Sequence, residues 1–121
     1  AKALDCNVGA IVKSLLFRTG DDFILCLVAG DKRCSLNKLK KLKDKKDILM
    51  ASPEEVKTQT GYTIGGVSPI GHLNKIEIII DKSLERFNQL FAAAGHPNCV
   101  FKINFINIQK ITNGKVENII E

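Results

Sequence analysis

The sequence predicts a single α+β domain, because strand patterns and helix signals follow one another along the chain without a linker. Three stretches have the apolar character of strands: 11–17, 23–29 and 76–80. Two further stretches carry the capping residues of helices: 35–42 and 52–61. The chain has 121 residues, enough for one hydrophobic core, and no repeat divides it. We therefore expect residues 1–121 to form one domain.

The first strand, 11–17, places a lysine among apolar side chains. Alternate residues of a strand share a face, and the other residues on the face of Lys13 are apolar: Ile11, Leu15 and Phe17. An ammonium group on such a face is unfavourable unless it reaches a cavity, a partner or a ligand. Lys13 is therefore the first residue to consider for chemistry. The alternative is that its stem packs and its ammonium extends to solvent at the end of the strand.

The second strand, 23–29, is apolar at every position, which is typical of a strand covered on both faces. The turn between the two strands, 18–22, is rich in Gly and Asp, so we expect the strands to form a hairpin. Ser35 is the predicted N-cap of a helix whose apolar residues recur at helical spacing: Leu36, Leu39 and Leu42.

The stretch from Lys32 to Lys46 carries eight basic residues and a single acid, Asp44, in a chain of net charge +5. Such a stretch suits contact with the phosphates of a polyanion. The alternative is a solvated helix face, which is the more common origin of a charge run. Lys32 and Arg33 lie in the loop after the second strand and are the better candidates for phosphate contact.

A second helix is predicted to begin at Ser52, with Pro53 in its first turn and Glu55 completing a capping box. Gly61 is the predicted end of this helix. The glycine-rich loop that follows, 65–71, lacks the Lys-Ser/Thr of a phosphate-binding loop and the glycine spacing of a dinucleotide site. Its glycines would let the backbone approach a ligand closely, and the alternative is an irregular turn.

After the strand 76–80, the pattern predicts a long helix that Asp81 caps and Gly95 ends. Its apolar residues recur at helical spacing: Leu84, Phe87, Leu90, Phe91 and Ala94. We then expect a strand, a helical turn and a closing strand, over 99–105, 108–111 and 116–120.

The cysteines and histidines lack the spacing of metal ligands, because no C-x-x-C pair is present and His72 lies far from His96 in sequence. We therefore expect no metal. A core of this size does not need disulfides, and no secretory signal opens the chain, so we expect a reducing, cytoplasmic location. The apolar runs are too short to span a bilayer, and no membrane association is expected.

Several stretches together resemble the YbaK/aminoacyl-tRNA deacylase family, which includes trans-editing proteins and the editing domains of prolyl-tRNA synthetases. They are VKSLLF (12–17), ASPEEV (51–56), TGY (60–62) and GGVSP (65–69), in this order. Gly30-Asp31 and Asp81-x-Ser83-Leu84 also match the family's pattern. The likeness runs from about residue 10 to residue 120.

The resemblance implies a mixed, barrel-like β-sheet surrounded by helices. Family members carry a further strand and helix before the point that matches Ala1, so the chain is expected to be N-terminally incomplete. The implied reaction is hydrolysis of the ester that joins a wrong amino acid to tRNA. Cys-tRNA(Pro) and Ala-tRNA(Pro) both remain open as substrates.

The resemblance also implies a site between Lys13 and the loop of Gly65, Gly66, Val67, Ser68 and Pro69. Lys13 would be the catalytic residue, holding the aminoacyl-ester or ribose end of the substrate, and the loop backbone would hold the amino group. No cofactor is needed if an ordered water, or a group on the substrate, is the nucleophile. His96 is a weaker candidate, because a surface histidine after a helix explains it equally well.

The implied partners are mischarged tRNA and a prolyl-tRNA synthetase, joined to the domain or separate from it. Lys32 and Arg33 are then candidates for contact with tRNA phosphates. The alternative function is a non-catalytic tRNA- or synthetase-binding module of the same fold. The presence of both Lys13 and the whole loop 65–69 favours the enzyme.

Overall fold

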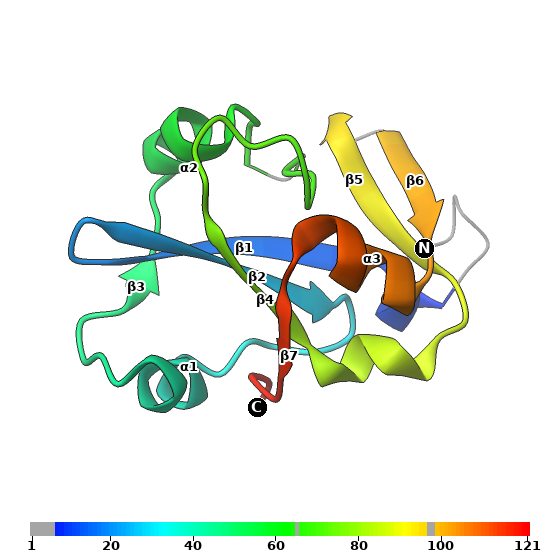
Figure 1. The fold of residues 1–121 in the computed structure, drawn as a ribbon, viewed down its shortest axis with the longest axis horizontal. Coiled ribbons are helices and arrows are strands. Elements are labelled where there is room, and N and C mark those ends of the chain that lie inside the picture. The colour runs from blue at the N-terminus through cyan, green and yellow to red at the C-terminus, as the bar shows by residue number, and fades with distance from the viewer. Residues whose placement is uncertain (1–6, 65, 97–98) are drawn as a thin grey trace.

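The computed structural model describes residues 7–64, 66–96 and 99–121. Its centre is a five-stranded sheet in the order β3-β1-β2-β4-β7 (Figure 1). In chain order these strands are β1 (Val12–Thr19), β2 (Asp22–Ala29), β3 (Leu49–Met50), β4 (Glu77–Asp81) and β7 (Lys115–Glu117). A separate antiparallel ribbon consists of β5 (Leu90–His96) and β6 (Cys99–Ile103).

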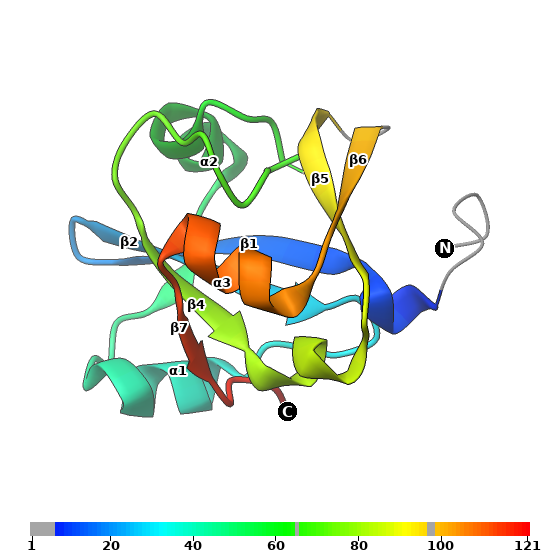
Figure 2. The ribbon, with the colours of Figure 1, turned by 45° about the vertical axis from the view of Figure 1, so that its right-hand side comes forward.

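The helices lie on both faces of the sheet, as Figure 2 shows. They are η1 (Val8–Ala10), α1 (Leu36–Lys43), α2 (Pro53–Thr60), η2 (Lys82–Arg86) and α3 (Phe105–Thr112). On one face, Val56 of α2 and Ile108 of α3 pack with the ribbon residue Leu90 against the sheet. On the other face, Leu39 of α1 packs with Ile119 near the C-terminus. The sheet is therefore the middle of three layers.

The predicted hairpin is confirmed. β1 and β2 pair antiparallel from Val12–Ala29 to Thr19–Asp22, and β4 lies parallel to β2 on its other side. The side chains of β2 from Leu25 to Ala29 are fully buried, which confirms that this strand is covered on both faces.

The predicted helix starts are also confirmed. The Ser35 hydroxyl accepts a hydrogen bond from the Lys38 backbone, and Ser52 and Glu55 form both halves of the capping box. Gly61 ends α2 with φ at 84°, a conformation that favours glycine. Among the described residues, no helix is long and apolar enough to cross a membrane.

The predicted long helix from Asp81 to Gly95 is wrong beyond its first turn. Asp81 does cap a helix, since its carboxylate accepts from the Ser83 backbone, but this helix is the short η2 and ends at Arg86. The chain then becomes extended at Phe87 and continues into β5. Apolar spacing over a short stretch fits a helix and a strand equally well, and pairing with β6 decides for the strand.

The strand expected over 99–105 ends at Ile103, because the Asn104 side chain caps α3 and Phe105 already belongs to that helix. The expected helical turn at 108–111 lies within α3, and the closing strand is the shorter β7. The α+β class is as predicted. The described strands do not close into a barrel, because β3 and β7 are the edges of an open sheet and the ribbon contributes only the Ile11–Phe91 bridge.

Candidate functional site

An apolar cleft lies along the edge of β1. β3 pairs with β1 only at Phe17 and Arg18, so within the described residues the part of β1 from 12 to 15 has no strand on that side. A cavity of about 390 Å³ occupies this place. Its walls come from β1, the two strands of the ribbon and the segment after α2, through side chains that include Ile64, Val67, Ala93 and Val100. The cleft is therefore assembled from segments far apart in sequence.

Lys13 lines this cleft from β1. The register places it opposite Val28, on the sheet face that α1 covers. The side chain is half-buried, and its ammonium donates a hydrogen bond to the backbone carbonyl of Lys32. The loop after β2 thus binds the charged group, so the ammonium does not simply extend into solvent.

The described part of the glycine-rich loop approaches β1 from the other face of the sheet. Gly66, Val67, Ser68 and Pro69 are all buried, and Val67 lines the cleft together with Lys13. Gly65 lies outside the described residues. The loop is held by its own hydrogen bonds, since the Gly66 backbone donates to Thr63 and His72 Nε2 donates to the Ser68 carbonyl at 2.7 Å.

Ser14 is a site residue that the sequence interpretation missed. It follows Lys13 on the opposite face of β1, lines the same cleft, and its Oγ is buried without a hydrogen-bond partner in the described structure. A buried hydroxyl without a partner is unfavourable, and a bound polar group would satisfy it. The sequence carries only a weak signal for it, because Ser14 shares its strand face with the apolar residues Val12 and Leu16.

Comparison with known proteins supplies the family. The family model for the aminoacyl-tRNA editing domain matches residues 1–111. The chain belongs to this family. The structure is also similar to a crystal structure of a candidate trans-editing enzyme for prolyl-tRNA synthetase, with a TM-score of 0.96 and 35% sequence identity, over 100% of this chain and 76% of that one.

Two curated relatives differ in the share of their own length that the chain covers. The uncharacterized protein YwhH of Bacillus subtilis (strain 168) is 36% identical over 117 residues, which are 96% of this chain and 74% of that protein. The proline–tRNA ligase of Thermosipho africanus (strain TCF52B) is 34% identical over 85 residues, 70% of this chain. The chain spans only 15% of the length of that ligase.

The loop after β2 links the editing domain's candidate tRNA contacts to Lys13. Lys32 is half-buried and Arg33 is exposed, and the Arg33 carbonyl accepts from the Glu121 backbone at 2.9 Å. Arg86 donates to both carboxylate oxygens of Asp31, at 2.8 and 3.3 Å, and this hydrogen bonding lowers the pKa of Asp31. The loop is thus fixed on both sides of Lys32.

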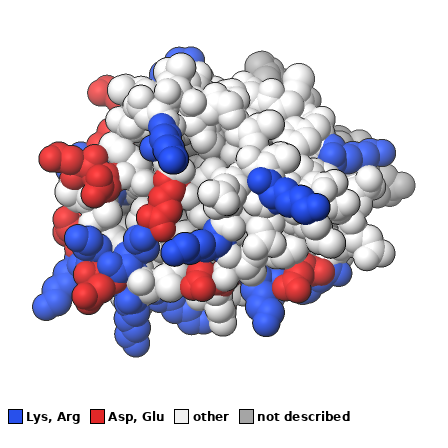
Figure 3. All heavy atoms as spheres, in the orientation of Figure 1, with Lys and Arg blue, Asp and Glu red and all other residues white. Residues whose placement is uncertain are grey.

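Charged side chains are unevenly distributed on the face drawn in Figure 3. They gather toward α1 and the turn of the hairpin, whereas the surface over β5 and β6 carries few of them. A cleft of about 440 Å³ near the hairpin turn has charged walls, including Lys45, Lys75 and Asp22. It contains none of the predicted site residues, so its size does not make it the site.

His96 ends β5, and its side chain lies outside the described part of the structure. Within the described residues, no three His, Cys, Asp or Glu side chains gather as they would around a metal ion. Among the described residues that line the cleft on β1, Lys13 and Ser14 carry polar side chains.

Proposed function

We propose that this editing domain hydrolyses the ester bond of mischarged tRNA, with Cys-tRNA(Pro) or Ala-tRNA(Pro) as its substrate. The observation that carries the proposal is the cleft on β1 in a member of the aminoacyl-tRNA editing family. The cleft is mainly apolar, which suits the side chain of alanine or cysteine, and its described wall includes the Lys13 cation and the buried Ser14 hydroxyl.

In the proposed mechanism, Lys13 is the catalytic residue and fixes the aminoacyl-ester or ribose end of the substrate through its ammonium. Attack of water on the ester carbon moves charge onto the carbonyl oxygen, and a positioned cation stabilises this charge. The described cleft residues include no carboxylate or imidazole that would act as a general base. An ordered water or a group on the substrate is therefore the proposed nucleophile.

The loop 65–69 has the positioning role in this proposal. Its backbone would hold the substrate's amino group, while Val67 limits the length of the side chain that the cleft accepts. The Ser14 hydroxyl would bond a polar group of the aminoacyl moiety or the terminal ribose. Cysteine and alanine differ by one sulfur atom, and a small pocket separates such groups by only ~1–3 kcal/mol.

The domain would act in the cytoplasm, where charged tRNA is used, and either as part of a prolyl-tRNA synthetase or beside one. The similarity to a ligase and to a candidate trans-editing enzyme supports both arrangements. A deacylation assay tests the activity itself. We expect release of cysteine or alanine from tRNA(Pro) and no release of proline from the correctly charged tRNA. Tight tRNA binding without any hydrolysis would instead support the non-catalytic binding module.

Replacing Lys32 and Arg33 by alanine should weaken tRNA binding and reduce its salt dependence. The slope of log K against log salt is negative, and each lost phosphate contact reduces its magnitude by roughly 0.7–0.9. The double variant should therefore reduce the magnitude of the slope by about 1–2. The backbone carbonyl of residue 32 remains, so the hydrogen bond from Lys13 is retained. Hydrolysis of a short aminoacyl-nucleoside mimic, which lacks these phosphates, should therefore be unchanged.

Filter binding over a salt series measures this slope. The matched control replaces Lys45 and Lys46, two exposed lysines after α1, which we expect to lie outside the tRNA contact. If replacing Lys45 and Lys46 reduces the magnitude of the slope as much as replacing Lys32 and Arg33 does, the net charge of the domain explains the binding. The assignment of the phosphate contact to the loop after β2 is then wrong.

A further inference from the structure

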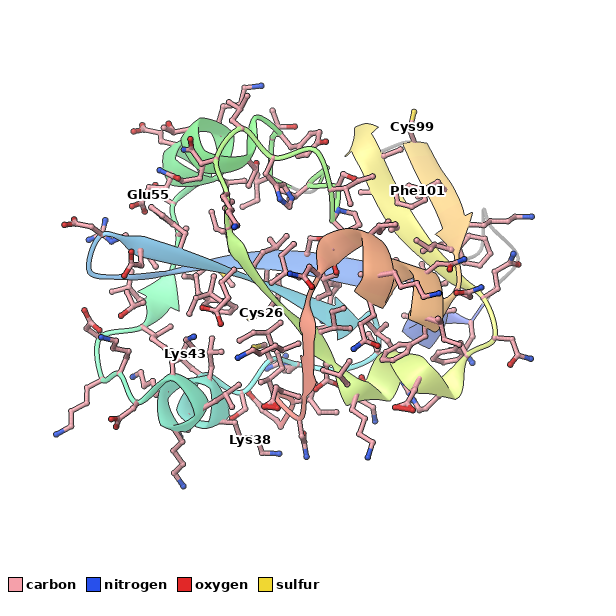
Figure 4. All side chains as sticks on the ribbon, viewed as in Figure 1. Cys26, Lys38, Lys43, Glu55, Cys99 and Phe101 are labelled. Atoms are coloured by element: carbon pink, nitrogen blue, oxygen red, sulfur yellow. The ribbon has the colours of Figure 1, made fainter. Side chains whose placement is uncertain are left out.

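Two cysteines meet on the face of the sheet that α1 covers. Cys26, labelled in Figure 4, lies in the middle of β2 and is fully buried. Cys34 lies at the end of the loop after β2, where its backbone forms an isolated antiparallel β-bridge with Ile120. Its side chain packs against the hydrophobic cluster that contains Cys26. Cys26 is inaccessible, whereas Cys34 is half-buried. One thiol is therefore open to a small reagent and the other is shielded.

Cys26 and Cys34 belong to one packed hydrophobic cluster, on the sheet face that Lys13 shares. Cys26 and Val28 share a face of β2, and Val28 is the cross-strand partner of Lys13. The hydrogen bond from the Cys26 thiol lowers the pKa of Cys34, and the Lys13 ammonium lowers it further, while partial burial and the Asp81 carboxylate act in the opposite direction. The same hydrogen bond and burial raise the pKa of Cys26. Cys34, the accessible thiol, is therefore the more acidic of the two.

We propose that Cys26 and Cys34 form a reversible disulfide when the protein meets a peroxide. The Cys34 thiolate attacks one oxygen of hydrogen peroxide, which breaks the O–O bond and gives a sulfenic acid on Cys34 and a hydroxide. The hydroxide takes up the proton that the Cys34 thiol released and becomes water. The Cys26 sulfur then attacks the Cys34 sulfur, the sulfenic oxygen leaves as a second water with the thiol proton, and the S–S bond forms. The two thiols lose two electrons, and one peroxide is reduced to two waters.

The disulfide would change the surroundings of Lys13. Cys34 is two residues after Lys32, whose carbonyl holds the Lys13 ammonium. A covalent bond from Cys34 to the rigid β2 displaces this part of the loop, and the ammonium moves with the carbonyl that it bonds. The consequence for turnover rests on the proposed function, whereas the formation of the disulfide does not.

Mass spectrometry tests the disulfide directly. The reduced protein is treated with hydrogen peroxide, its remaining thiols are alkylated, and it is cleaved with trypsin without reduction. Lysines and arginines separate the four cysteines into different tryptic peptides, 3–13, 19–32, 34–38 and 87–102. We expect peptides 19–32 and 34–38 to be joined, and to separate after dithiothreitol. Oxidation of Cys34 beyond the sulfenic acid with Cys26 still alkylated, or a link to Cys6 or Cys99, would overturn the proposal.

Cys99 provides the matched control, since it is exposed at the start of β6, away from Cys26 (Figure 4). Replacing Cys99 by serine should leave the joined peptides unchanged. In C34S, Cys26 should stay reduced at the same peroxide concentration, because the accessible thiol is gone. C26A should leave a sulfenic acid on Cys34 that dimedone labels. Because the wild-type digest already decides whether the disulfide forms, failure of a variant to fold does not remove the test.

Deacylation measured before and after oxidation tests the connection to Lys13. We expect oxidation to lower turnover by roughly 10-fold to 100-fold, since a misplacement of about 1 Å has effects of this size, and dithiothreitol to restore it. Unchanged turnover with the joined peptides present would overturn the connection to Lys13. A domain that deacylates no tRNA would overturn the proposed function, and the joined peptides would still establish the disulfide.

Discussion

Replacing Lys13 by methionine should lower kcat/KM for deacylation by about 10²–10³, the usual effect of removing one stabilising group from a developing oxyanion. The methionine side chain keeps most of the apolar stem that packs along β1, so the change removes charge and little packing. Lys13→Ala should be at least as damaging, because it also removes the stem. Deacylation kinetics on the mischarged tRNA, together with a thermal melt of each variant, measure both effects.

The comparison between these variants separates a catalytic lysine from a structural one. If the Lys13 ammonium is catalytic, both variants should lose activity while their melting temperatures stay near the wild-type value. If the methionine variant retains nearly full turnover, Lys13 is a packed stem and the proposed mechanism is wrong. Lys38→Ala is a matched control, since this exposed lysine on α1 contacts the Ile120 carbonyl, and we expect full activity from it.

Asp81→Ala should cause a large loss of stability. Asp81 is fully buried at the end of β4, where Oδ1 accepts from the Ile119 backbone and Oδ2 from the Ser83 backbone, each at 2.8 Å. Alanine would leave both N–H groups without this acceptor, which lowers the free energy of unfolding by about 2–4 kcal/mol. For a domain of this size the melting temperature should fall by roughly 10 °C. Calorimetry or a circular-dichroism melt measures the change.

Asp81→Asn distinguishes the hydrogen bonds from the shape of the side chain. Its amide oxygen replaces one acceptor, while its NH₂ group faces a backbone N–H in place of the other, so an intermediate loss is expected. Glu85→Ala is the control, because this acid of η2 is exposed and should change the melting temperature little. A small effect of Asp81→Ala would show that the C-terminal segment does not depend on this carboxylate.

Local signals predicted a large part of the fold. The hairpin, the cap at Ser35 and the capping box at Ser52 depend on neighbouring residues, which the sequence displays directly. The stretch 90–96 was misassigned because its strand character comes from pairing with β6, and its own apolar spacing fits a helix too.

The candidate site, like the fold, could be predicted only where a local sequence pattern was sufficient. Lys13 stood out because one strand pattern was enough to show a charge on an apolar face. Ser14 became evident only when the structure placed its hydroxyl in a cleft without a partner. That cleft is built by β1, the ribbon and the segment after α2. These segments are far apart in sequence, so no local sequence pattern shows that they lie side by side. The assigned roles of Lys13 and the loop 65–69 stay predictions until the variants are measured.

The order of strands has a kinetic consequence for the chain as it folds. β1 and β2 are joined by a tight turn, and such a hairpin closes in about 1–10 μs. The other edge of β2 pairs with β4, which is parallel to it and follows only after the long stretch 30–76. Closing that long segment is the slower step. Until it is complete, an apolar strand edge is available to other chains, so refolding yield should decrease as protein concentration rises.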